Sequence, residues 1–150
     1  MRLAIEKARE GVAKGNSPFG ACIVRGSEVV ALDHNVVWQT TDITAHAEIS
    51  ALRHACRDLR TIDLSGCTIY STTEPCPMCF TASHWARLER IVFGASIADA
   101  ARAGFNELTV SNDVLKRDGG SSIEIVSGFM REECGELFDY WQKHATKPAY

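Results

Sequence analysis

The sequence lacks any apolar run long enough to cross a membrane, and it contains neither a repeat nor a low-complexity segment. A membrane-spanning helix needs about 20 predominantly apolar residues, whereas the longest uncharged stretches here are interrupted by polar residues, glycine or proline. Near the N-terminus, Glu6, Lys7, Arg9 and Glu10 are charged where a signal peptide needs an apolar core. These absences exclude a membrane protein and a disordered tail, and they predict a cytoplasmic protein.

A basic stripe is also missing. There are 16 lysine and arginine residues against 19 acidic ones, for a net charge of −3, and the only adjacent basic pair is Lys116-Arg117. Proteins that bind nucleic acid draw most of their affinity from basic side chains that contact phosphates. The charge pattern therefore favours a small-molecule partner over nucleic acid.

The six cysteines do not indicate a disulfide scaffold, because the chain carries no secretion signal and is longer than such scaffolds usually are. Four of them stand singly among apolar neighbours, as buried free thiols do: Cys22, Cys56, Cys67 and Cys134. The remaining pair, Cys76 and Cys79, lies in a different context.

What is present is the composition of a soluble globular protein, with 45% hydrophobic and 23% charged residues, and we expect a single domain over residues 1–150. Helical spacing of apolar residues predicts helices at 2–14, 44–60, 77–88 and 132–143, with more helical turns near 97–104 and 111–117. Short apolar runs predict strands at 20–24, 29–32, 67–71, 90–94 and 123–126, the first two forming a hairpin. This order predicts a three-layer α/β/α sandwich around a five-stranded mixed sheet. The long connection at 95–122 predicts that strands 4 and 5 are parallel.

Two segments carry the chemistry: TAHAE at 44–48 and EPCPMC at 74–79, each at an expected helix start. Cys76 and Cys79 are three residues apart, so their sulfurs share one helix face, and the positive end of the helix dipole stabilises thiolates there. With the imidazole of His46 they supply three protein ligands for Zn²⁺, the donor number of a catalytic site. Glu48, two residues after His46, can accept a proton from water.

Other interpretations of the cysteine pair remain open at this point. Cys76 and Cys79 could form a redox pair, which leaves His46 and Glu48 unexplained. They could belong to a structural zinc site closed by His84 or Cys134, or they could be buried thiols in an inactive relative.

The two segments together make the pattern H-x-E…P-C-x-x-C, and in this the chain is similar to zinc-dependent deaminases of the cytidine-deaminase-like superfamily. Within that superfamily it most resembles the bacterial guanine deaminases. The stretches that carry this resemblance are PFGA at 18–21, Asn35, residues 42–48 and 74–79, WAR at 85–87, ADAARAGF at 98–105 and the final Tyr150.

The resemblance implies roles for particular side chains. Substrate contacts are implied for a side-chain amide, a backbone group and four aromatic rings, namely Asn35, Ala47, Phe19, Trp85, Phe105 and Tyr150. The segment that ends in Tyr150 closes the pocket in the family and can be exchanged between subunits, so the resemblance implies a homodimer, with domain swapping. Aromatic faces and a few fixed polar groups suit a planar purine.

The implied reaction is hydrolysis of guanine to xanthine and ammonia, with Glu48 as the proton shuttle. Glu107 occupies the position where the family often has an aspartate that handles a proton on the departing amine, and Ile43 replaces a proline usual before Thr44. Relatives accept guanosine, cytosine or aminated triazines, and tRNA adenosine deaminases share both motifs. A non-catalytic zinc protein is a further alternative.

Overall fold

The computed structural model describes residues 1–150 and has the predicted five-stranded mixed sheet, in the order β2-β1-β3-β4-β5. Strand β1 is antiparallel to β2 and β3, whereas β3, β4 and β5 run parallel to one another. The prediction that strands 4 and 5 are parallel is therefore confirmed. The strands are β1 (Gly20–Arg25), β2 (Glu28–His34), β3 (Cys67–Thr73), β4 (Arg90–Ala95) and β5 (Glu124–Val126).

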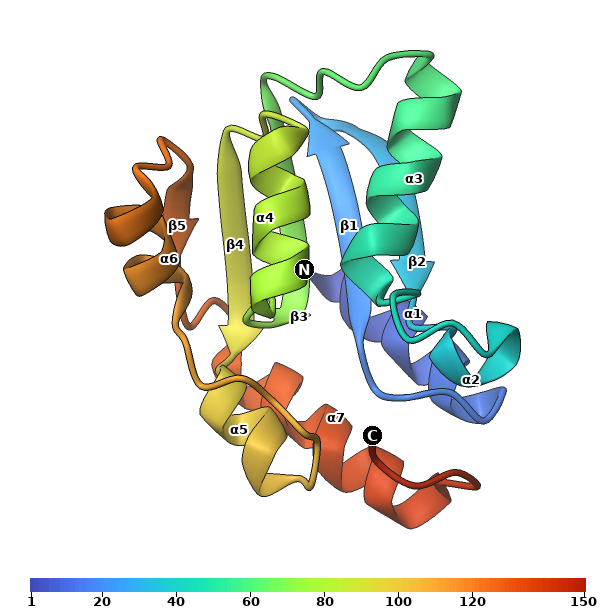
Figure 1. Cartoon of the computed structure of the whole chain (residues 1–150). Helices are drawn as coiled ribbons and strands as arrows, with labels where there is room; N and C mark the ends of the chain where they lie inside the picture. Colours follow the sequence, from blue (N-terminus) through green and yellow to red (C-terminus); the bar gives the residue numbers. More distant parts are fainter.

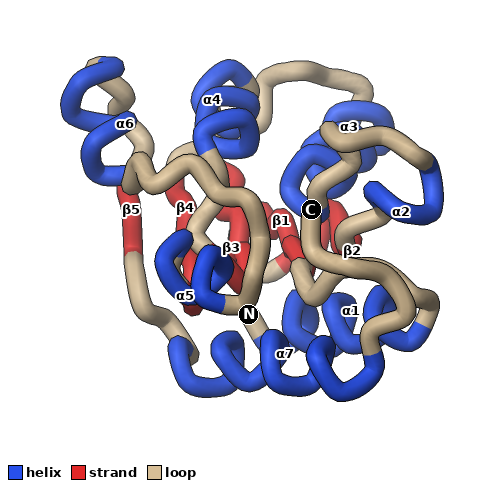
Figure 2. The backbone as a smooth tube through the Cα atoms, turned by 60° about the horizontal axis from the view of Figure 1, so that its bottom comes forward, coloured by secondary structure: helices blue, strands red, loops and turns tan.

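Helices cover both faces of this sheet, which confirms the three-layer architecture (Figures 1 and 2). Helices α3 (Ala47–Leu59) and α4 (Pro77–Trp85) pack on one face, with α6 (Asn112–Gly119) beside α4. Helices α1 (Arg2–Ala13) and α7 (Arg131–His144) pack together on the other face. The short helices α2 (Val37–Thr40) and α5 (Ile97–Arg102) lie in the connections after β2 and β4. None of these helices is both long and apolar enough to span a bilayer.

Each face of the sheet has its own hydrophobic core. Under α3 and α4 the core includes Ile23, Ile69 and Ile91, all with no exposed surface. Under α1 and α7 the buried positions of the helices recur at helical spacing, as the sequence predicted, and in α7 these are Cys134, Leu137, Phe138 and Trp141. Because the sheet is buried on both faces, β4 is apolar from Ile91 to Ala95.

The close packing of α1 against the sheet depends on Gly20 at the start of β1. A Cβ at this position would collide with the backbone carbonyl of Ala4 in α1. The close approach of α1 therefore requires a glycine at this position of the PFGA segment. Phe19, the preceding residue, lies at the end of the sheet where β1 begins.

Two helix boundaries differ from the prediction by three residues, and one connection contains a helical turn that was not predicted. Helix α3 begins at Ala47 and not at residue 44, because His46 has an extended backbone (ψ 159°) and forms the N-cap. Helix α4 ends at Trp85 because Arg87 adopts a left-handed conformation (φ 59°). The region 36–43, expected as a polar connection, contains the single helical turn of α2.

Candidate active site

Three side chains that could ligate a metal meet where α3 and α4 begin, at the carboxyl end of β3. His46 is the N-cap of α3, Cys76 is the N-cap of α4, and Cys79 lies in the first turn of α4. The His46 Nδ1 atom is 3.7 Å from the Cys76 Sγ and 3.6 Å from the Cys79 Sγ, and all ligand atoms lie within 4.8 Å of one another.

This spacing fits zinc. Bond lengths of about 2.3 Å to sulfur and 2.0 Å to nitrogen give a nitrogen–sulfur edge of about 3.5 Å in a tetrahedron. The structural-zinc alternative needs a fourth protein ligand, and neither suggested residue is in the group. His84 pairs its Nδ1 with Ser121 Oγ at 3.0 Å, and Cys134 packs on Gly94 from the opposite helical layer. Three protein ligands therefore leave the coordination open on one side.

The cysteine pair is prepared for metal binding. A hydrogen bond from Cys79, together with the nearby His46, lowers the pKa of the Cys76 thiol to about 4 although burial opposes the shift. The same pairing, together with burial, raises the pKa of Cys79. One thiolate is thus already favoured at neutral pH before a cation binds.

Glu48 projects from the first turn of α3 into the same site. It is only 6% exposed, and burial raises the pKa of its carboxyl group. The Oγ of Ser71, on β3, donates a hydrogen bond to its Oε1 at 3.1 Å. A buried carboxyl next to the ligands is suited to exchanging a proton with water.

A second acid, Glu107, faces the same space from the connection between α5 and α6. Burial, reinforced by the negative charge of Cys76, raises the pKa of Glu107 to about 7. A group with this pKa can hold or release a proton at neutral pH.

These side chains surround a small cavity of about 20 Å³, room for roughly one water molecule. The residues that line it come from five separate stretches of the chain: Phe19, His46, Glu48, Thr73, Glu74, Cys76, Phe105, Glu107 and Tyr150.

The C-terminal segment forms the roof of this cavity. The amide of Asn35 donates a hydrogen bond to the Tyr150 hydroxyl at 2.5 Å, and the Tyr150 carbonyl accepts the N–H of Asn106 at 2.9 Å. The Tyr150 ring packs edge-on against Phe105, with centroids 5.9 Å apart, and lies 6.1 Å from the His46 ring. In this structure the segment folds over the site of its own chain.

Most residues singled out in the sequence are brought together here. Phe19, Phe105 and Tyr150 line the cavity, and Asn35 reaches its edge through Tyr150. Ala47 is buried at the start of α3. Trp85 lies at the other end of α4, is 75% exposed, and is not among the lining residues.

Sequence reasoning missed Thr73 and Glu74, which line the cavity, and Ser71, which contacts Glu48. The only local signal for Glu74 was its place directly before Pro75-Cys76. Ser71 had no signal beyond its position near the end of a strand.

Comparison with known proteins identifies the family. The model of the cytidine and deoxycytidylate deaminase zinc-binding region matches residues 1–95, which include all three ligands and Glu48. The chain belongs to this deaminase family. It is a zinc-dependent aminohydrolase, and the recognition from the two sequence motifs is confirmed. The redox and inactive-thiol interpretations are thereby set aside.

Two curated relatives cover nearly the whole chain. Guanine deaminase of Bacillus subtilis is 36% identical over 151 residues, which span 100% of this chain and 96% of the relative. The tRNA-specific adenosine deaminase of the same organism is 35% identical over 147 residues, covering 98% and 89%. These identities are nearly equal, so they do not distinguish guanine from adenosine in tRNA as the substrate.

Solved structures repeat the pattern. A guanine deaminase from Nitrosomonas europaea superimposes with a TM-score of 0.84 at 28% identity, covering 95% of this chain and 82% of that one. A structure from studies of A-to-I editing by tRNA:A34 deaminases has a TM-score of 0.80 at 31% identity, covering 91% and 96%. Both share the deaminase fold described above.

Proposed function

We propose that this deaminase hydrolyses guanine at C2 to give xanthine and ammonia. The observation that carries the proposal is the small cavity in which the metal ligands and two acids lie beneath Tyr150 and beside the rings of Phe19 and Phe105. A flat base can pack against rings of this kind, and aromatic rings with a few fixed polar groups are typical of sites for small molecules. The similarity to guanine deaminases over the full chain supports the same choice.

His46, Cys76 and Cys79 would hold a zinc ion, which would supply the Lewis acidity that makes water nucleophilic near neutral pH. Glu48 then has two tasks: it accepts a proton from the attacking water, and it delivers that proton to a ring nitrogen of the base. Ser71 donates to one oxygen of Glu48 and thereby fixes the orientation of the carboxylate beside the metal ligands.

Loss of ammonia requires a second proton transfer, to the exocyclic nitrogen. Glu107 is suited to it because its pKa of about 7 allows it to carry a proton into the site at neutral pH. When the carbon–nitrogen bond breaks, the nitrogen leaves as ammonia and the water oxygen remains on C2. Asn35 supplies an amide that can bind the edge of the base once Tyr150 moves aside.

Ammonia release from guanine tests the proposal, with guanosine, cytosine, adenine and an aminated triazine as alternative substrates. Guanine should turn over fastest, and Glu48→Gln should keep its zinc but lose turnover by about 10³-fold or more, as removal of an essential proton shuttle does. Rapid turnover of another compound with guanine inert would contradict the choice of base.

Deamination of adenosine in tRNA is the second candidate, favoured by the 35% identity to the Bacillus subtilis tRNA-specific enzyme. The net charge of −3 is unfavourable for a polyanionic partner. A gel shift with tRNA that weakens as salt increases, together with inosine formation, would favour this candidate over guanine.

The resemblance to guanine deaminases also leads us to propose a homodimer in which the C-terminal segment is exchanged. Mixing refolded Glu48→Gln chains with chains truncated after Ala145 tests the exchange. In a swapped dimer the Glu48→Gln chain donates its intact segment to the site of the truncated chain, so mixing should restore activity. Activity that stays at the level of the truncated parent after mixing would argue for the closed monomeric arrangement.

A further inference from the structure

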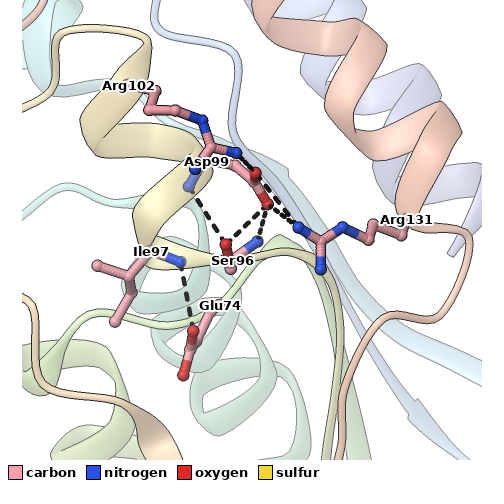
Figure 3. A network of polar contacts seen from close by, with 6 residues as sticks. All are labelled: Glu74, Ser96, Ile97, Asp99, Arg102 and Arg131. Carbon is pink, nitrogen blue, oxygen red and sulfur yellow. Dashed lines mark hydrogen bonds and ion pairs between the residues drawn. The ribbon is translucent and has the colours of Figure 1, made fainter.

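Glu74 joins two helices that are far apart in the sequence. Its Oε2 accepts the backbone N–H of Ile97 at 3.3 Å, and its Oε1 accepts the backbone N–H of Asn112 at 2.8 Å. Ile97 is the first residue of α5 and Asn112 is the first residue of α6. One carboxylate therefore satisfies an N–H group at the start of each helix, and Figure 3 shows the contact with Ile97.

The segment between these two contacts carries two residues of the pocket, Phe105 and Glu107. From residue 105 to 111 it has no helix or strand (Figure 1). The backbone N–H of Asn106 donates to the carbonyl of Tyr150 in the C-terminal segment, whereas the N–H groups of Phe105, Glu107 and Val110 bond only to nearby residues. Because both ends of the segment are bound to the same carboxylate, the positions available to Phe105 and Glu107 depend on Glu74.

Glu74 is itself firmly held. Its backbone N–H donates to the carbonyl of Ala95 at the end of β4, at 2.8 Å. The fully buried side chain of Asn112 donates to the carbonyl of Pro75 at 2.6 Å, which adds a second link between α6 and this stretch of chain. The stretch leads directly into the metal ligand Cys76, so the ligands and the segment share one rigid support.

This arrangement explains why a third acid lines the cavity beside Glu48 and Glu107. Each carboxylate oxygen of Glu74 already accepts a backbone N–H, so the group acts as a fixed hydrogen-bond acceptor. Glu48 receives a single hydroxyl, from Ser71. The difference in partners separates a reacting acid from a supporting one.

We propose that Glu74 is a positioning residue that fixes segment 97–112 and thereby places Phe105 and Glu107 over the zinc ligands. The catalytic consequence rests on the function proposed above, while the structural consequence does not. The two are therefore tested by separate measurements on the zinc-loaded, full-length protein.

Amide hydrogen exchange tests the anchoring. Glu74→Gln keeps the shape of the side chain but turns an NH₂ group toward one of the two backbone N–H groups. Because a hydrogen bond to a charged group is lost, the amide of Ile97 or Asn112 should exchange at least about tenfold faster. The backbone amides of residues 103–111 should also exchange faster than in the wild type.

Asp99→Asn is the matched control, because it also weakens the start of α5. Asp99 forms a capping box with Ser96 and ion pairs with Arg102 and Arg131 (Figure 3). None of its hydrogen bonds or ion pairs is with α6. This variant should loosen α5 while the amide of Asn112 keeps its exchange rate.

A double-mutant cycle with Glu107→Gln tests the catalytic consequence. Since a misplacement of about 1 Å can cost 10²-fold in rate, Glu74→Gln should lower kcat for guanine by about 10- to 100-fold per zinc-loaded folded chain. In the Glu107→Gln background the same change should cost less than about threefold, because the residue through which it acts is already gone. Asp99→Asn should leave kcat within about threefold of the wild type.

Each result bears on the proposal. Unchanged exchange at both Ile97 and Asn112 in Glu74→Gln overturns the anchoring role. Losses that multiply in the double variant overturn the route through Glu107 and leave only a general effect on folding. If the wild type does not deaminate guanine at all, the proposed function fails, and the exchange data still decide whether Glu74 holds the segment.

Discussion

Replacing Ser71 tests how the carboxylate of Glu48 is oriented. Ser71 is 2% exposed and Glu48 is 6% exposed, and the hydrogen bond between them is 3.1 Å long. A hydrogen bond to a charged group contributes about 1.5–3 kcal/mol, and about 1.4 kcal/mol corresponds to a factor of ten in rate. If the bond is maintained in the transition state, Ser71→Ala should lower kcat/KM for guanine by about 10- to 150-fold.

Threonine and valine give a matched pair of controls, because they have nearly the same shape and differ in the hydroxyl group. Both add one methyl-sized group beside Glu48, so any cost of crowding is common to the two variants. Ser71→Thr keeps a donor for Glu48, whereas Ser71→Val has none. Steady-state kinetics, zinc content per chain and thermal unfolding should be measured for both.

The reasoning requires Ser71→Thr to retain at least about tenfold more activity than Ser71→Val at equal zinc content, which is about 1.4 kcal/mol. Equal activities of the two variants would refute it, because they would show that the hydroxyl does not matter. A loss of zinc in both would move the role of Ser71 from Glu48 to the shape of the metal site.

Three further outcomes are expected. In Asp99→Asn the free energy of unfolding should fall by about 1 kcal/mol at pH 7, since the charged half of the capping box is lost while Ser96 remains the N-cap. Burial opposes the shift, but the bonds from Ser96 and the charges of Arg131 and Arg102 hold the pKa of Asp99 below its usual value. This stabilisation therefore exists above about pH 4 and should disappear as the pH falls through the folded-state pKa in denaturant titrations. Removal of zinc by a chelator should lower Tm by about 8–16 °C when the lost occupancy corresponds to about 4 kcal/mol, and both Tm and activity should return with added Zn²⁺ but not with Mg²⁺. Truncation after Ala145 removes the roof of the cavity, so KM for guanine should rise roughly tenfold or more through lost aromatic contact, with zinc content unchanged; an unchanged KM would show that the segment does not contact substrate.

The parts of the site that the sequence predicted are those encoded locally. Cys76 and Cys79 are three residues apart on one helix, and His46 and Glu48 are two apart, so each pair is fixed by local geometry once the helix starts are known. The strands followed from apolar runs, and the parallel direction of β4 and β5 followed from the length of the connection between them. These features need no knowledge of the distant chain.

The supporting contacts were beyond reach for the opposite reason. Glu74 meets Ile97 and Asn112 across 23 and 38 residues, and Asn35 meets Tyr150 across 115. Such pairs arise from the packing of the whole molecule, and a sequence pattern contains no sign of them. The exposure of Trp85 has the same origin, because its side of α4 is decided by where α4 meets α3 and α6.

Three carboxylates beside one cavity illustrate how surroundings decide chemistry. Glu48 is buried and has one hydroxyl partner, so it is available for proton exchange next to the metal ligands. The Glu107 side chain makes no hydrogen bond or ion pair, and its pKa is about 7 because burial and the charge of Cys76 disfavour its ionised form. Glu74 has both oxygens bound to backbone N–H groups. The same functional group thus serves as shuttle, as second acid and as support, and the assignment follows from its neighbours and not from its identity.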